Sequence, residues 1–258
     1  MNLLDLSDKI ILITGGCGAI GRVIVKTLAD HGATVAVNDI LPDEAAIQIL
    51  QESGANNPNV AYFQADTTDP VAVNRLFDEV TARLGVPNVV CCHAGMVEAF
   101  PVEQYPVAQF DQLMNLNLRA SFIVAQTASQ RWIASHTPGH LIFTASWVAD
   151  VPWPEITPYT ASKAAMKQMA RGFARELVTK NIRANVIAPG IVAVGLAKRQ
   201  WDTDPSYRAR AGKAIPLGYM QPPETIGHAF LFLCSHMADY MTGSVLLVDG
   251  GCSLYPMD

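Results

Sequence analysis

The sequence has 258 residues, of which 50% are hydrophobic and 16% are charged, and its formal net charge is −5. This balance argues against nucleic acid as a partner, because binding a phosphate backbone requires a basic surface. No apolar run reaches the roughly 18 residues that a bilayer-spanning helix needs, and the acidic first residues do not resemble a secretory signal, so we expect no membrane partner.

The cysteines and histidines are scattered through the chain. The five cysteines include no Cys-x-x-Cys pair, and the six histidines form no cluster with the spacing of metal ligands. We therefore expect neither a disulfide framework nor a bound metal. Unpaired thiols are typical of proteins in a reducing compartment, so the pattern predicts a cytoplasmic location.

In chain order, short apolar runs alternate with longer amphipathic stretches. Residues 9–14 are predicted to form a buried strand, and a helix is predicted over residues 20–31. Asp69 and Pro70 are predicted as the N-cap and the first residue of another helix. Further strands are predicted at residues 34–39, 60–65, 89–93, 140–146, 183–188 and 245–248, and further helices at about 107–134, 158–179 and 223–235.

Apolar strands that alternate with helices indicate an α/β fold with a doubly wound parallel sheet covered by helices on both faces. We find no internal repeat and no linker, so residues 1–258 are expected to form a single domain. Residues 190–222 form one long irregular stretch. Loops of this length are usually functional, so this stretch is expected to be a substrate lid, with a simple surface excursion as the alternative.

A glycine-rich segment, residues 14–21, joins the first strand to the first helix. Glycines let the backbone approach a pyrophosphate closely, and a helix N-terminus offers free N–H groups with a partial positive charge. A glycine cluster in this position predicts a dinucleotide site. The predicted contacts are Gly15, Cys17, Gly18, Ala19, Ile20 and Gly21.

The residue at the end of the second strand, Asp39, bears on the choice of cofactor. A carboxylate there accepts hydrogen bonds from the adenosine ribose and repels a 2′-phosphate, which predicts NAD rather than NADP. Asp66, after the third strand, is predicted to meet the adenine edge, with a turn or a helix cap as the alternative. The other predicted cofactor contacts are Thr67, Ala94, Gly95, Tyr159, Lys163, Pro189, Gly190 and Val192.

Ser146, Tyr159 and Lys163 form the predicted catalytic group. Tyr159 and Lys163 are four residues apart, so they share one helix face. A nearby cation lowers the pKa of a phenol, which makes Tyr159 the expected acid/base in hydride transfer between a nicotinamide and an alcohol or ketone. Ser146 is expected to hydrogen-bond the substrate oxygen, and Asn117 to hold a water or a backbone carbonyl that passes protons to Lys163.

With these motifs the chain resembles the short-chain dehydrogenases/reductases, in their short, single-domain branch, over nearly its whole length. The resemblance implies that Ser146, Tyr159 and Lys163 are the family's catalytic triad and Asn117 its fourth catalytic residue. It also implies a Rossmann-like sheet of seven parallel strands in the order 3-2-1-4-5-6-7. A homo-oligomer, a tetramer or a dimer built partly on the two long helices, is implied as well.

The sequence departs from the family pattern at several positions. Ala19 stands where this branch usually has glycine, and Val194 stands where a threonine is common. The family's Asn-Asn-Ala-Gly after strand four is replaced by a segment that begins Cys92-His93. His93 is expected to replace part of the hydrogen-bond support that the amides give to strand four, with substrate contact as the alternative.

The substrate is expected to be a small molecule. Trp147, Trp153 and Trp201 suggest a sugar, a polyol or a related polar compound, unless they pack the lid or an oligomer contact. The lid's basic residues would favour an anion, although Asp202 and Asp204 lie among them. An acyl-chain or steroid ketone reductase and a non-catalytic dinucleotide-binding sensor are the alternative functions; the intact catalytic group argues against the sensor.

Overall fold

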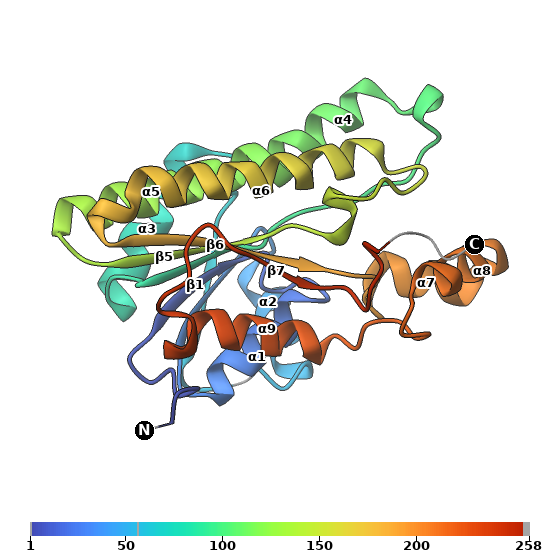
Figure 1. Ribbon diagram of the computed structural model, residues 1–258. Helices are drawn as coiled ribbons and strands as arrows, with labels where there is room; N and C mark the ends of the chain where they lie inside the picture. The colour runs from blue at the N-terminus through green and yellow to red at the C-terminus, as the bar shows by residue number, and fades with distance from the viewer. Residues whose placement is uncertain (1, 56, 255–258) are drawn as a thin grey trace.

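The structure is a computed structural model that describes residues 2–55 and 57–254. Its centre is a sheet of seven parallel strands in the order β3-β2-β1-β4-β5-β6-β7 (Figure 1). This confirms the α/β fold and the strand order that the family resemblance implies. The strands are β1 (Ile10–Thr14), β2 (Thr34–Asp39), β3 (Val60–Gln64), β4 (Val89–Cys92), β5 (Gly139–Thr144), β6 (Ile182–Pro189) and β7 (Val245–Val248).

Each face of the sheet has its own apolar core. In β1, Leu12 packs into one core, whereas Ile11 and Ile13 pack into the other, as alternation along a strand requires. The first core lies under α3 (Pro70–Leu84), α5 (Ser121–Ser135) and α6 (Thr157–Leu177). The second lies under α1 (Gly21–Asp30), α2 (Asp43–Glu52) and α9 (Glu224–Cys234), on the opposite side in Figure 1. Because helices cover both faces of the sheet, the side chains on both sides of each strand are buried, which explains why the strands are continuously apolar.

The long helix predicted at residues 107–134 is interrupted. It consists of α4 (Val107–Met114), a π-helical segment η2 (Asn115–Ala120) and α5. The wider turn contains the fully buried Asn117, and π-helical turns often occur at functional sites. The helix α2 was not among the predicted helices, and it buries only Ala46 and Leu50.

The prediction that residues 190–222 form one irregular stretch is wrong. This segment contains α7 (Gly195–Thr203) and α8 (Pro205–Ala214). The Asp204 side chain accepts hydrogen bonds from the backbone N–H groups of Ser206 and Tyr207, and Pro205 is the first residue of α8. These are ordinary signals for the start of a helix.

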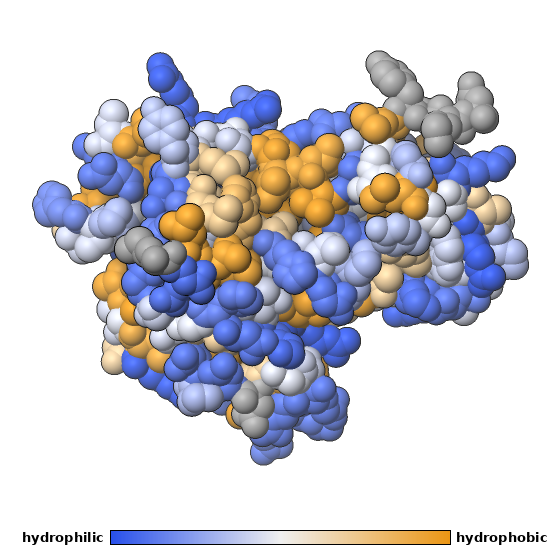
Figure 2. Space-filling model, turned by 60° about the horizontal axis from the view of Figure 1, so that its bottom comes forward, coloured by the Kyte–Doolittle hydropathy of each residue, from blue (hydrophilic) through white to orange (hydrophobic). Residues whose placement is uncertain are grey.

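The surface carries both polar and apolar groups. Figure 2 shows polar residues along much of the margin of one face and apolar residues gathered in patches between them. Large exposed apolar side chains include Leu217 and Tyr219, and also Leu247, which belongs to the edge strand β7. Within the described residues, no helix has the length and apolar character to cross a membrane, and no group of His, Cys, Asp or Glu side chains could hold a metal ion.

Candidate active site

A cavity of about 780 Å³ opens at the carboxyl ends of the strands. It lies across β1 and β4, where the strand order reverses, which is the usual ligand crevice of a doubly wound sheet. The predicted residues that line it are Gly15, Gly18, Ala19, Ile20, Asp39, Asp66, Thr67, Ala94, Gly95, Ser146, Trp147, Trp153, Tyr159, Lys163, Pro189, Gly190 and Val192. Four other predicted residues do not line it: Cys17, Gly21, Asn117 and Trp201.

The glycine loop brings the start of α1 to one end of the cavity. Gly15 has a φ of +69°, and a Cβ there would lie 2.8 Å from the Ala94 Cα, so only glycine fits between β1 and β4. A Cβ on Gly21 would overlap the carbonyl oxygen of Gly15, so this glycine allows α1 to start against the loop. Ala19 and Ile20 line the cavity, and among the described residues no acceptor pairs with their N–H groups. This arrangement fits a bound pyrophosphate.

The same end of the cavity is acidic. One oxygen of Asp39 accepts a hydrogen bond from the N–H of Cys17 at 3.1 Å. Cys17 therefore holds the Asp39 carboxylate through its backbone and does not line the cavity. Asp66 accepts hydrogen bonds from the backbone N–H and the hydroxyl of Thr68 at 2.8 and 2.7 Å, so its carboxylate forms a turn and also lines the cavity. Lys163 and Arg210 are the only lysine or arginine side chains among the residues that line the cavity.

His93 joins the ends of two neighbouring strands. Its Nδ1 hydrogen-bonds the hydroxyl of Thr144, which ends β5, at 3.1 Å. The Thr14 hydroxyl accepts hydrogen bonds from the N–H groups of His93 and Ala94 at 3.1 Å each. Burial lowers the pKa of His93 to about 3, and the charge of Lys163 adds to the shift. The neutral imidazole therefore gives the end of strand four the hydrogen-bond support expected from the sequence, and because His93 also lines the cavity, contact with the substrate stays a prediction.

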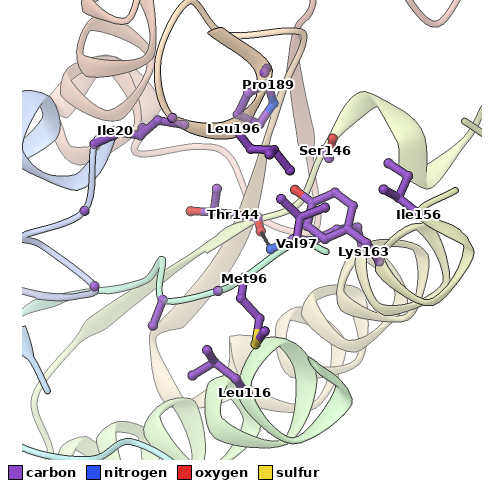
Figure 3. A pocket seen from close by; sticks show the side chains of 18 of the residues that line it. Ile20, Met96, Val97, Leu116, Thr144, Ser146, Ile156, Lys163, Pro189 and Leu196 are labelled. Carbon is purple, nitrogen blue, oxygen red and sulfur yellow. Dashed lines mark hydrogen bonds between the residues drawn. The ribbon is translucent and has the colours of Figure 1, made fainter. Parts of the chain in front are cut away.

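The buried Lys163 is fixed to the end of β5. Its Nζ donates a 2.7 Å hydrogen bond to the Thr144 carbonyl oxygen, drawn as a dashed line in Figure 3, and it lies 5.5 Å from the centre of the Tyr159 ring. Burial lowers the pKa of Lys163 to about 8. Ser146 lies two residues past β5, further along than predicted, and lines the same cavity.

The expected lowering of the Tyr159 pKa is not what the structure shows. Burial raises this pKa to about 12, and only the neighbouring Ser146 hydroxyl acts in the opposite direction. The free-energy cost of removing the phenolate from water is larger here than the stabilisation that the Ser146 hydroxyl gives to the phenolate. The phenol is therefore protonated near neutral pH, which is the form that donates a proton.

The Asn117 side chain holds a backbone carbonyl, that of Met96, and its part in passing protons to Lys163 stays a prediction. Its Oδ1 accepts a hydrogen bond from the N–H of Met96 at 2.8 Å, and its Nδ2 donates to the Met96 carbonyl at 2.9 Å and to the Ser162 hydroxyl at 3.3 Å. The carbonyl oxygen of Asn117 itself accepts from the Ser121 hydroxyl at 3.0 Å. The side chain thus clamps the segment after β4, which carries Met96 along the cavity wall.

Aromatic side chains form the wall beyond Ser146. The ring centres of Trp147 and Trp153 are 5.4 Å apart, and those of Trp153 and Tyr207 are 6.2 Å apart. Trp201 packs against this aromatic group without lining the cavity. Large apolar residues of the cavity lining include Met96, Val97, Leu116, Trp147, Val148, Trp153, Ile156, Ile191, Leu196 and Tyr207.

Several residues of the wall were not predicted from the sequence. Met96 and Val97 follow Gly95 directly, and their place after a central strand is a signal that points to them. Glu155 also lines the cavity, with a φ of 70°. The N–H of Phe100 donates a 2.8 Å hydrogen bond to the Glu155 carbonyl and holds this left-handed turn. No sequence signal distinguishes Arg210 from the other basic residues of α8.

Comparisons with known proteins agree with this geometry. The family model described as enoyl-(acyl carrier protein) reductase matches residues 16–253. The 3beta-hydroxysteroid dehydrogenase 1 of Eggerthella lenta is 30% identical over 98% of this chain and 96% of its own length. The 5-keto-D-gluconate 5-reductase of Escherichia coli is 29% identical, over 97% of each chain. The crystal structure of a gluconate 5-dehydrogenase from Burkholderia cenocepacia, in complex with NADP and tartrate, has a TM-score of 0.90 and 27% identity over 98% of each chain.

Proposed function

The chain belongs to the short-chain dehydrogenase/reductase family, and we propose that it is an NAD-dependent oxidoreductase that interconverts a secondary alcohol and a ketone. The observation that carries this proposal is the meeting of Ser146, Tyr159 and Lys163 in one cavity. The free N–H groups of Ala19 and Ile20 lie at the other end of that cavity. One end suits a dinucleotide, and the other suits proton transfer to a bound oxygen.

Each residue has a part in the proposed reaction. A bound nicotinamide dinucleotide supplies the hydride donor or acceptor. The Tyr159 hydroxyl donates its proton to the ketone oxygen in reduction and takes it back in oxidation. The Ser146 hydroxyl orients that oxygen. Lys163, held by the Thr144 carbonyl with its Nζ 5.5 Å from the centre of the Tyr159 ring, fixes the helix face that carries the phenol. Asn117 positions the Met96 segment that closes the cavity.

The preference for NAD rests on Asp39. Its carboxylate lines the adenosine end of the cavity, and neither Lys163 nor Arg210, the only lysine and arginine of the lining, comes from the β2 end. A 2′-phosphate would meet a negative charge there without a compensating cation. One relative described above carries NADP, so the preference is proposed for this chain alone and needs a direct comparison of the two cofactors.

The segment of residues 190–222 is proposed as the substrate lid of a single catalytic domain spanning residues 1–258. Its helices α7 and α8 supply Leu196, Tyr207 and Arg210 to the cavity. A lid made of two short helices excludes water from the reacting carbon and selects the substrate.

The substrate end of the cavity favours one of the two substrate classes. A sugar or a polyol would leave many hydroxyl groups without partners against the walls formed by Trp147, Trp153 and Ile156. A ketone on an apolar skeleton would bury those walls instead. The relative named for 3beta-hydroxysteroids supports this choice, while the two relatives named for gluconate compounds keep the polar class as the second candidate.

A homotetramer and a cytoplasmic location complete the proposal. Val107, Phe110 and Phe122 are exposed on the helical stretch that includes α4 and α5, which gives apolar area for a second copy of the chain. All five cysteines are unpaired, as in proteins of reducing compartments.

The test is the absorbance of reduced nicotinamide with purified protein and a panel of sterols, hydroxy acids, polyols and simple alcohols, using NAD and NADP separately. The proposal expects turnover with NAD on one class of secondary alcohol. Tight binding of NAD in calorimetry, without turnover in either direction on any class, would instead support a non-catalytic sensor.

A further inference from the structure

One cation of the lid faces the cavity. The guanidinium carbon of Arg210 lies 5.1 Å from the ring centre of Trp153 and 5.9 Å from that of Tyr207, and all three residues line the cavity. A guanidinium stacked on aromatic rings keeps its N–H groups free at its edge, where they match a carboxylate. Among the described residues, no carboxylate forms an ion pair with Arg210.

The acidic residues that surround Arg210 in sequence are engaged elsewhere. Asp202 pairs with Lys198 at 2.5 Å on the exposed side of α7. Asp204 caps α8 through the N–H groups of Ser206 and Tyr207. Neither carboxylate forms an ion pair with Arg210, although the charge of Arg210, after the hydrogen bonds from Ser206 and Tyr207, contributes to lowering the pKa of Asp204.

The two ends of the substrate region differ in chemistry. Lys163 is the only other lysine or arginine in the cavity lining, and the Thr144 carbonyl holds it beside Tyr159. Trp147 follows Ser146 directly, and the ring of Trp153 lies 5.4 Å from that of Trp147 and 5.1 Å from the guanidinium carbon of Arg210. The cavity thus has a proton-transfer group at one end, a free cation at the other and an apolar wall between them.

We propose that the substrate is an organic anion, in which an apolar skeleton joins the reacting ketone or secondary alcohol to a carboxylate that pairs with Arg210. This inference rests on the proposed function for the reaction at Tyr159. Arg210 is then a specificity-determining residue, since it contacts the carboxylate and not the reacting carbon. Glu155 lines the same end with an exposed carboxylate, so it opposes the bound anion.

The test uses matched pairs that differ only in charge: cyclohexanone carboxylate and a ketocholanate, each beside its own methyl ester. The values of kcat/KM are measured with the wild type, Arg210→Met and the matched control Arg199→Met. Arg199 is an exposed arginine of α7 that does not line the cavity. Binding of the same compounds in the presence of NAD is measured by calorimetry in Tyr159→Phe, with and without Arg210→Met, so that affinity is read without turnover.

Because Arg210 is an exposed residue, the wild type is expected to prefer at least one acid over its ester by about 2- to 5-fold, as for a solvent-screened ion pair. Arg210→Met should bring the ratio close to one, Arg199→Met should keep it, and Glu155→Gln should keep or raise it. Equal binding of acids and esters, or an acid preference that survives in Arg210→Met, would overturn the inference and leave the proposed reaction standing. Acid-selective binding that Arg210→Met abolishes, without turnover of any compound, would support this inference and contradict the proposed reaction.

Discussion

The Nζ of Lys163 and the carbonyl oxygen of Thr144 are 2.7 Å apart, so the ammonium of α6 is fixed to the end of β5. The chain reaches Ser146 two residues after that carbonyl, and Tyr159 precedes Lys163 by one helical turn. One hydrogen bond therefore sets the helix that carries the acid/base against the strand end that carries the hydroxyl. This contact accounts for the convergence of residues that are far apart in the sequence.

The first prediction concerns the cofactor. Asp39→Ala removes the carboxylate that would repel a 2′-phosphate, and Asp39→Ala with Ile40→Arg adds a cation for it. We expect the ratio of kcat/KM for NAD to that for NADP to fall by 10-fold or more in the double variant, since one ion-pair contact is worth about 1.4 kcal/mol or more.

Asp66→Asn serves as the control, because this carboxylate lies at the same end of the cavity and forms a turn with Thr68. It should change the affinity for both cofactors without changing their ratio. An unchanged ratio in both Asp39 variants would mean that Asp39 does not read the ribose.

The second prediction concerns acid stability. Burial holds the pKa of His93 at about 3 in the folded protein, against 6.5 for an ordinary histidine. Above pH 6.5 both states are neutral, and between pH 6.5 and 3 only the unfolded chain takes up the proton. The wild type should therefore lose about 1.4 kcal/mol of unfolding free energy per pH unit in that window through His93 alone.

His93→Asn removes the titrating group and keeps a side chain that can hydrogen-bond Thr144. Urea unfolding at several pH values should show a shallower loss of stability in the variant than in the wild type, whereas the exposed His136→Asn should follow the wild type. Burial also lowers the pKa of His140, so in every variant His140 still contributes to the loss of stability as the pH falls. Parallel curves for wild type and His93→Asn would contradict the assignment.

The third prediction concerns the clamp on Met96. Asn117→Leu leaves the N–H and the carbonyl of Met96 without their partners at 2.8 and 2.9 Å. Because Asn117 is fully buried, we expect a loss of about 2–4 kcal/mol of unfolding free energy. The measurement is denaturant unfolding at neutral pH. Asn115→Leu, two residues earlier in the same π-helical segment, should cost much less. Equal losses in the two variants would contradict the assignment of Asn117 as the clamp on Met96.

Much of the fold follows from the sequence, because strands buried on both faces are marked by continuous apolar runs. The elements that were missed bury little. The helix α2 buries only Ala46 and Leu50, and α8 buries only Tyr207 and Ala211. A helix with only two buried residues has an amphipathic pattern that is too weak to distinguish from that of a polar loop. The π-helical turn at Asn115–Ala120 has no sequence signal of its own, because its register depends on packing around Asn117.

The site follows the same division. Residues tied to strand ends or to one helix face, such as Asp39, Tyr159 and Lys163, lie in the cavity as predicted. Trp201 does not line it, because the fold of α7 and α8 turns this side chain toward the aromatic group behind the wall. The direction of the Tyr159 pKa was also missed, since the extent of burial around a phenol cannot be read from its spacing to a lysine.

The role of Tyr159 is tested by comparing wild type and Tyr159→Phe in the reduced-nicotinamide assay, on a substrate found in the panel, with NAD binding measured in parallel. Removing the one acid/base hydroxyl should lower kcat by about 100- to 10,000-fold, while the dissociation constant for NAD stays within a few-fold of wild type. Near-normal kcat in Tyr159→Phe, with NAD still bound, would contradict the central claim that the Tyr159 hydroxyl carries the proton.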